Sequence, residues 1–182
     1  MPREPMIDDK VAFLRRPDAY THDPGQVEVR ETHMSWLFLT GERAYKLKKP
    51  VRYPHLDFST LERRKHFCEE ELRLNRRFTD DIYLRLVPLR IDDRDQLTLS
   101  STGRIVDYLV EMRQLPAALM LDHRIRLGRV TTSEILTVAD RLARYYAAAT
   151  PRIAGGHAYL KHLRDEFALS QDLLLNPEMR VA

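Results

Sequence analysis

The sequence predicts an α+β fold: an antiparallel sheet carrying one long helix, followed by a helical portion. Between residues 27 and 114, short apolar runs alternate with charged and turn residues, a pattern typical of paired strands. Residues 59–78 contain neither glycine nor proline and start with a helix-capping signal. From Thr131 onward, the apolar residues recur at helical spacing. A chain of 182 residues suits one ordinary domain or two small lobes.

The composition indicates a folded protein of the cytoplasm. Hydrophobic residues make up 43% of the chain, enough for a core, and charged residues make up 31%. The formal net charge of +3 is too small to argue for nucleic-acid binding by itself. Cys68 is the only cysteine, which excludes an internal disulfide and fits a reducing compartment. The sequence shows no signal-peptide core and no apolar run approaching the ~20 residues of a membrane helix, so we expect no membrane partner.

The segment 1–26 predicts a short helix and a loop. Asp8 or Asp9 is placed to cap a helix that ends before Pro17. Two prolines and one glycine then make residues 16–26 a loop.

A hairpin is predicted on either side of Gly41, which supplies the freedom that a tight turn needs. The apolar run 36–39 forms its first strand and residues 43–48 its second. Alternation places Tyr45 and Leu47 on one face of the second strand, and Ala44, Lys46 and Lys48 on the other. A small residue two positions before a lysine leaves room for a flat ligand beside a fixed positive charge. The alternative is an edge strand whose lysines deter aggregation.

The helix over residues 59–78 starts with a capping box formed by Ser59 and Glu62. Its predicted apolar stripe consists of Phe67, Leu74 and Phe78.

Glu71 lies in the middle of that stripe and has no cation three or four residues away. Glu69 and Glu70, by contrast, each have a basic neighbour at that spacing. An unpaired buried carboxylate costs several kcal/mol, so Glu71 needs a cation from elsewhere in the chain. We expect that cation to come from the preceding lysine strand. The alternative places Glu71 at the margin of the stripe, in contact with water.

A strand lysine paired with a helix glutamate holds the phosphates of ATP in protein-kinase-like folds. The stretches ETHMSWLFLTGERAYKLKKP and LDFSTLERRKHFCEEELRLNRRF resemble the N-terminal part of the aminoglycoside-phosphotransferase-like family, in particular the branch often fused to a P-loop ATPase domain. Ala44-Tyr45-Lys46 matches the A-x-K of the kinase strand, and Glu71 with Phe78 matches the E-x6-L pattern of the kinase helix. The resemblance covers residues 27–149.

The resemblance implies a protein-kinase-like N-lobe over residues 27–114 and the helical start of an incomplete C-lobe over residues 115–182. It implies ATP and Mg as cofactors and a small-molecule hydroxyl as phosphate acceptor. Lys46 would contact the phosphates and Glu71 would hold it, with Lys48 as the competitor for the phosphate role. Ala44, the first residue of the A-x-K match, would also belong to the cofactor site.

The turn between the first two strands covers the phosphates in kinase-like folds. Here it contains no glycine, so the backbone has less freedom to approach a phosphate. Thr32, His33 and Ser35 offer hydroxyl, imidazole and amide donors. The alternative is an ordinary polar connection between strands.

Residues 82–91 predict a strand in which Pro88 indicates an edge or a bulge. Residues 97–99 and 105–112 predict a hairpin around Gly103. The stretch YLVEMRQLP, residues 108–116, resembles the kinase strand and hinge, which places Met112 against the base and residues 111–114 in the hinge. The alternative is a core strand running into a loop.

Two helices are predicted toward the C-terminus. Thr131 and Glu134 form a capping box for the first helix, and the second ends near Asn176-Pro177. The apolar face of the first helix consists of Ile135, Val138, Ala139, Leu142, Tyr145 and Tyr146. If these faces stay exposed, we expect self-association or a protein partner.

The H-G-D-x-x-x-x-N catalytic loop of the family is absent, because none of the seven histidines is followed by Gly-Asp. The stretch His162 to Asp165 (HLRD) lies inside a helical pattern. We therefore expect an ATP-binding portion that is inactive alone, with no catalytic residue and no metal ligand in this chain. The alternative is a shortened, non-catalytic nucleotide- or protein-binding module. The arginines between residues 63 and 77 alternate with glutamates, so we expect a solvated helix surface and no nucleic-acid partner.

Overall fold

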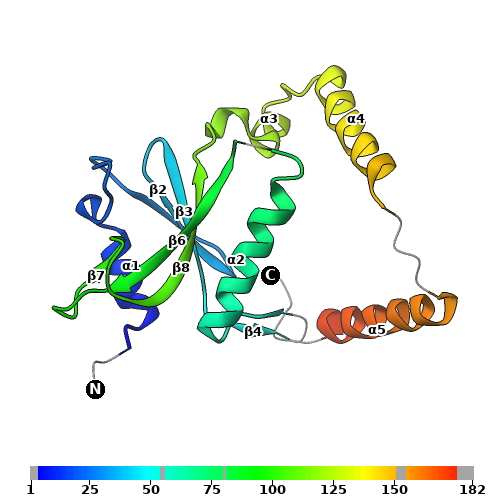
Figure 1. Ribbon diagram of the computed structural model, residues 1–182. Coiled ribbons are helices and arrows are strands. Elements are labelled where there is room, and N and C mark those ends of the chain that lie inside the picture. Colours follow the sequence, from blue (N-terminus) through cyan, green and yellow to red (C-terminus); the bar gives the residue numbers. More distant parts are fainter. Residues whose placement is uncertain (1–3, 54–55, 80, 151–154, 176–182) are drawn as a thin grey trace. The chain divides into compact units, whose positions relative to one another are not determined.

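The computed structural model describes residues 4–53, 56–79, 81–150 and 155–175. The chain divides into two compact units, Met1–Val130 and Thr131–Ala182. The first unit contains the sheet and the long helix, and the second contains two helices, as Figure 1 shows. The α+β fold class predicted from the sequence is confirmed.

The first unit is built on a curled, antiparallel, six-stranded sheet with the order β1-β2-β3-β8-β6-β7. Its strands are β1 Glu28–Glu31, β2 Ser35–Leu39, β3 Arg43–Lys48, β6 Tyr83–Ile91, β7 Leu97–Thr98 and β8 Arg104–Arg113. The short strands β4 Arg52–Tyr53 and β5 Leu56–Asp57 form a separate pair. The helical elements of this unit are α1 Ile7–Leu14, α2 Leu61–Asn75 and α3 Leu121–Arg126, with 3-10 turns at Pro17–Ala19 and Ala117–Leu119.

The two faces of the sheet are covered by different helices. Tyr45 and Leu47 of β3 pack in one cluster with the α1 residues Val11 and Leu14. Ala44, two residues along from Lys46, packs in another cluster with Cys68 and Leu72 of α2. The division of faces predicted for residues 43–48 is confirmed, because strand alternation and burial agree.

The predicted hairpin between residues 97–99 and 105–112 is wrong, because β7 pairs with β6 and not with β8. The turn after β6 is closed by the Asp92 side chain, which accepts hydrogen bonds from the backbone N–H groups of Arg94 and Gln96 at 2.9 Å. These local bonds reverse the chain direction, so that β7 pairs with the end of β6 before the chain continues into β8.

Pro88 lies in β6 opposite Tyr108 of β8. On the other side, β7 pairs only with Arg90 and Ile91, so Pro88 occupies an edge position as predicted. A register shift between Leu89 and Arg90 follows it directly.

Both helix starts predicted in the first unit are displaced. Helix α1 has Met6 as its N-cap, and Asp9 lies in the first turn, where its carboxylate accepts from the Met6 N–H at 2.8 Å. Helix α2 is capped by Thr60, which accepts from Arg63 N–H at 3.3 Å. The Ser59 hydroxyl is instead bound to Asp57 at 2.5 Å, which removes Ser59 from the capping role. The helix ends at Asn75 and not at Phe78.

The second unit consists of α4 Thr132–Ala148 and α5 Gly156–Leu175. The capping box of Thr131 and Glu134 is confirmed, with the Glu134 N–H donating to the threonine hydroxyl at 3.3 Å. Several apolar side chains of α4 are exposed, among them Ile135, Leu136 and Val138. In the described part of the chain, no helix combines the length and the apolar character needed to cross a bilayer.

Candidate functional site

Glu71 of α2 binds two lysines of β3 at once. Its Oε1 atom lies 2.8 Å from Lys46 Nζ, and its Oε2 atom lies 2.6 Å from Lys48 Nζ. The Glu71 side chain is 12% exposed. The predicted pairing of this glutamate with the lysine strand is confirmed, and both lysines take part.

The apolar stripe of α2 differs from the predicted one. The residues that face the sheet are Arg64, Cys68 and Leu72, whereas Leu74 is exposed. These three residues are spaced four apart and so lie on one side of the helix. Glu71 lies three residues after Cys68, which places it at the border of that side. The glutamate is therefore directed inward, although the sequence pattern assigned the wrong apolar neighbours.

The electrostatics of this cluster favour an ionised carboxylate. Burial acts to raise the pKa of Glu71, but the charges and hydrogen bonds of Lys46 and Lys48 outweigh it, so the pKa lies below its ordinary value. Two ammonium groups face one carboxylate. One positive charge is therefore left without compensation from Glu71, and an anionic group is the ligand that would balance it.

The two lysines differ in their access to solvent. The Lys46 side chain is 28% exposed, and that of Lys48 is 7% exposed. Lys48 Nζ also lies 4.9 Å from the centre of the Phe58 ring, in a cation–π contact. Lys46 is thus the lysine that can reach a ligand, whereas Lys48 is held inside the protein.

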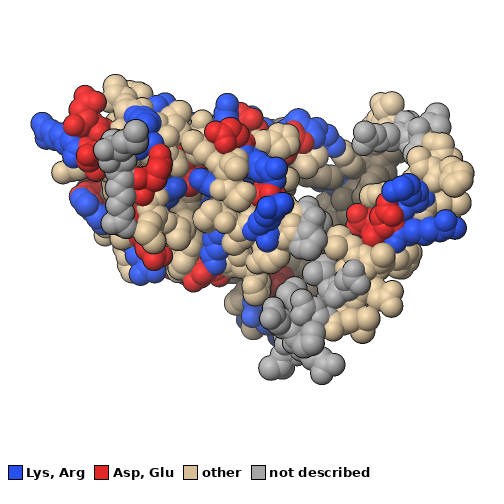
Figure 2. Space-filling view, turned by 90° about the horizontal axis from the view of Figure 1, so that it is seen from below, with Lys and Arg blue, Asp and Glu red and all other residues tan. Residues whose placement is uncertain are grey.

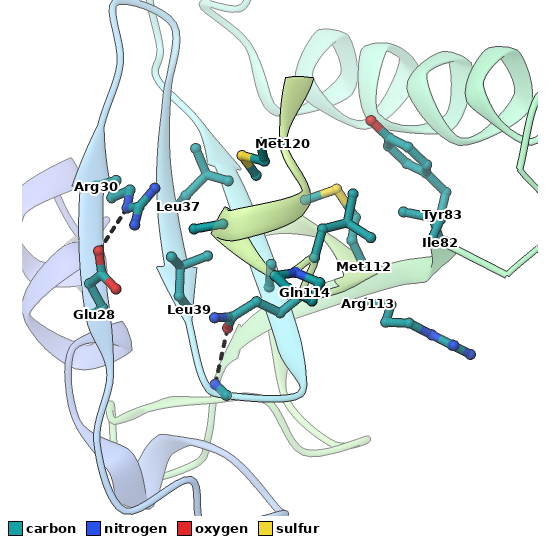
Figure 3. A pocket seen from close by; sticks show the side chains of 15 residues that line it. Glu28, Arg30, Leu37, Leu39, Ile82, Tyr83, Met112, Arg113, Gln114 and Met120 are labelled. Atoms are coloured by element: carbon teal, nitrogen blue, oxygen red, sulfur yellow. Dashed lines mark hydrogen bonds and ion pairs between the residues drawn. The ribbon is translucent and has the colours of Figure 1, made fainter. Parts of the chain in front are cut away.

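A cavity of about 680 Å³ lies on the same face of the sheet (Figure 3). Its apolar walls are formed by Leu37, Leu39, Ala44, Ile82, Tyr83, Met112, Leu115 and Met120. Figure 3 shows Leu37 and Leu39 of β2, Met112 of β8 and Tyr83 of β6 arranged around one space. Pockets of several hundred Å³ with mainly apolar walls are typical of small-ligand sites.

Gln114 fixes the mouth of this cavity. Its side-chain Oε1 atom accepts a hydrogen bond from the Gly41 N–H at 3.0 Å, shown in Figure 3. Its backbone N–H donates to Glu42 O at 2.9 Å. These bonds tie the chain after β8 to the turn between β2 and β3. Arg30 and Glu28 of β1 form an ion pair of 2.7 Å on the same rim.

The cavity and the ion pair share one face of the sheet. Ala44 lies two residues before Lys46 on β3, and Leu37 of β2 is the register partner of Lys46. Tyr83 provides a second link: burial, and then the nearby charge of Glu71, raise the pKa of its hydroxyl. Lys46, Lys48 and Glu71 do not line the cavity themselves, and Lys46 is linked to it through its neighbours Ala44 and Leu37, which do.

Ser35 is not brought to the cavity surface. It is 1% exposed and lies opposite Lys48 in the register of β2 and β3. The Thr32 hydroxyl accepts from the Ser35 N–H and donates to Ser35 O, both at 3.0 Å. His33 lies in the same turn. The polar groups of Thr32 and Ser35 therefore bind each other and close the turn.

Tyr83 and Arg30 are cavity residues that the sequence did not indicate. Tyr83 enters the site because β6 pairs with β8, where it lies opposite Met112. Met112 and Ala44, both predicted site residues, are register partners across β8 and β3. The long-range pairing of β6 leaves no signal in the local sequence, which is why Tyr83 was missed.

The arginines of α2 are engaged within the protein. Arg63 binds Asp57, Arg64 binds Asp107 and Arg73 binds Glu70. On the face of the molecule in Figure 2, acidic and basic side chains are interspersed. Mixed charge of this kind is typical of a solvated surface.

The comparisons with known proteins give relatives but no activity. No known protein-family profile matches the chain, and no solved structure matches it. Uncharacterized proteins of Mycobacterium bovis and of two strains of Mycobacterium tuberculosis are 31% identical to it over 123 residues. The match covers 68% of this chain but 23% of each relative, so the chain spans less than a quarter of their length over that match.

Proposed function

We propose that residues 27–114 form the nucleotide-binding lobe of an aminoglycoside-phosphotransferase-like kinase. In this proposal the chain is the ATP-binding portion of a small-molecule phosphotransferase. The observation that carries it is Glu71 bound to Lys46 at 2.8 Å, on the sheet face that lines an apolar cavity of about 680 Å³.

The cavity supplies the site for the base. Its volume lies within the range of small-ligand pockets, and its walls suit a flat, weakly polar ring. Ala44 carries only a methyl group and faces Met112 across the sheet, which leaves width for such a ring. The polar groups near Gln114 lie at the mouth and would fix the orientation of the ring edge.

The lysine cluster supplies the site for the phosphates. Lys46 would contact them, because its side chain is partly exposed and its ammonium group is held in place by Glu71. Lys48 would stay bound to Glu71 and add to the positive potential. Glu71 therefore has a positioning role in this proposal and does not touch the ligand.

Magnesium would reach the site on the phosphates of the nucleotide, where it neutralises charge. Within the described residues, no group of three or more His, Cys, Asp or Glu side chains is arranged to hold a metal ion by itself. The residues of this chain bind and orient the nucleotide. The acceptor proposed is a hydroxyl group of a small molecule, as in the family that the sequence resembles.

Calorimetric titration with MgATP tests the proposal. We expect the chain to bind MgATP and Lys46→Met to weaken the affinity at least tenfold. Lys65→Met is the matched control, because Lys65 is exposed on α2 and pairs with Glu69. Undiminished binding by Lys46→Met would show that this lysine is not the phosphate contact.

A non-catalytic binding module is the second candidate, favoured by the exposed apolar side chains of α4, such as Ile135 and Leu136. Its proposed partner is a second copy of this chain. Sedimentation equilibrium separates the candidates: a chain that self-associates but does not bind MgATP supports the module and not the kinase lobe.

A further inference from the structure

Three buried charged side chains join α1, α2 and β8. Asp107 of β8 accepts from Lys10 Nζ of α1 at 2.7 Å through Oδ2, and from Arg64 Nε of α2 at 2.8 Å through Oδ1. All three residues are buried. We refer to Lys10, Arg64 and Asp107 as the Asp107 cluster.

Lys10 and Arg64 also donate to backbone carbonyl groups. Lys10 Nζ donates to Val106 O at 3.1 Å. Arg64 Nη1 donates to Phe58 O at 3.0 Å and to Ser59 O at 3.2 Å, just before α2 begins. The cluster therefore fixes the start of α2 as well as its inner face.

Arg64 and Glu71 lie seven residues apart on α2, which is two helical turns or about 10 Å along the axis. Both point toward the sheet. Helix α2 is thus attached to the sheet by two ionic contacts, one at Asp107 and one at the lysines of β3. Cys68 lies between these contacts and is 0% exposed.

Buried ion clusters contribute little net stability compared with apolar residues of the same volume, because desolvation offsets the attraction between the charges. Their bonds are directional, however, and specify how elements lie against one another. An apolar contact would allow α2 to slide along the sheet, whereas Asp107 binds one guanidinium and one ammonium in defined positions.

We propose that Asp107 is a positioning residue, which places α2 through Arg64 and thereby sets Glu71 against Lys46. Because Lys10 binds the same carboxylate, α1 is coupled to the position of α2, although the two helices cover opposite faces of the sheet. The consequence for nucleotide affinity rests on the proposed function. The placement of α2 itself does not.

Cys68 provides a readout that needs no ligand. It is the only cysteine of the chain, and its side chain faces the sheet. A thiol reagent reaches it only when α2 separates from the sheet or when the protein unfolds. Measuring the rate of Cys68 labelling at increasing urea concentrations separates these two routes. Labelling through global unfolding rises with urea along the denaturation curve, whereas labelling through local separation of α2 proceeds already without urea.

The decisive variants are Arg64→Met and Lys10→Met. Each leaves Asp107 with one cation, so the buried carboxylate stays paired. We expect Arg64→Met to raise the labelling rate in the absence of urea at least tenfold, and Lys10→Met to raise it at least threefold. Arg63→Met is the matched control, because Arg63 is an exposed arginine on the same helix. Cys68 in this variant should be labelled at the wild-type rate.

Equal labelling of all variants and the wild type would overturn the proposal. A rate that rises only in proportion to global unfolding would also overturn it, since the cluster would then contribute to stability alone. Arg64→Lys should restore most of the protection, because a lysine can still bind Asp107. If the wild type does not bind MgATP, the proposed function fails, and the labelling result still decides whether Asp107 places α2.

Discussion

Lys46 and Glu71 are separated by 25 residues in the sequence and meet in an ion pair of 2.8 Å between β3 and α2. The same carboxylate binds Lys48 at 2.6 Å, so one glutamate holds two lysines of one strand face. This arrangement links the stability of the first unit to the geometry of its candidate ligand site.

Glu71→Gln is expected to lower the free energy of unfolding by roughly 2 kcal/mol, because it leaves the buried Lys48 without a carboxylate. Urea denaturation followed by the fluorescence of Trp36, the only tryptophan, measures this change. The control is Glu70→Gln, since Glu70 lies on the outer side of α2 and pairs with Arg73. It should leave the urea midpoint unchanged. Equal midpoints for both variants would contradict the assigned role of Glu71.

The contribution of Glu71 to stability should depend on pH below about 4.5, the ordinary pKa of a glutamate. Its folded-state pKa is lowered, so its contribution is complete above the unfolded-state value. As the pH falls, the unfolded chain takes up the proton first, and the contribution is lost as the pH passes through the folded-state pKa. The difference in stability between the wild type and Glu71→Gln should therefore shrink as the pH falls below about 4.5. A constant difference would argue against an ionised Glu71.

Substitution of Lys48 should cost more stability than substitution of Lys46, whereas substitution of Lys46 should cost more ligand affinity. Lys48→Met is expected to lower the free energy of unfolding by about 1–2 kcal/mol, since it removes a buried ion pair and a cation–π contact. Lys46→Met should cost less than about 1 kcal/mol, because this lysine is closer to solvent. For MgATP affinity the order should reverse. Urea denaturation and calorimetry on the same two variants check both halves.

Ala44→Leu should block the cavity without unfolding the protein. Ala44 lines the cavity but is 5% exposed and also packs against Cys68 and Leu72, so the larger side chain is expected to cost about 1–3 kcal/mol of stability while it fills the cavity. We expect the affinity for MgATP to fall at least tenfold, while Ala44→Ser, which preserves the size, retains binding. Full binding by Ala44→Leu would place the nucleotide outside this cavity.

Gly103→Ala is expected to destabilise the chain by about 3 kcal/mol or more. Gly103 has a φ of +107°, and a Cβ atom there would lie 2.3 Å from Ile91 O. Gly25 is a matched control, because its φ is +66° and a Cβ would meet nothing within 4 Å. Gly25→Ala should cost about 1–2 kcal/mol, from backbone strain alone. Thermal or urea denaturation compares the two.

The features predicted correctly from the sequence are those set by local spacing. Alternation along β3 placed Tyr45 and Ala44 on opposite faces, and the lack of a nearby cation indicated that Glu71 would seek one on another element. The cap at Thr131 was also correct, because its partner Glu134 lies within one turn.

The wrong predictions concern residues that compete for one role and strands that pair over long distances in the sequence. Ser59 and Thr60 are both suitable caps, and Asp57 decides between them by binding the serine. The strand β7 joins β6 because of the Asp92 turn, which no apolar pattern records. Asp107 interrupts an apolar run, but its two cations come from helices far away in the sequence, so its role is visible only in the fold.

The unequal count of charges at Glu71 has a practical consequence for work with this protein. Two lysine ammonium groups share one carboxylate, so we expect small anions in solution to be attracted to this cluster. If the proposed function holds, phosphate or sulfate in a buffer should compete with the nucleotide phosphates, and monovalent anions such as chloride should compete less. We expect binding to appear strongest in zwitterionic buffers of low ionic strength.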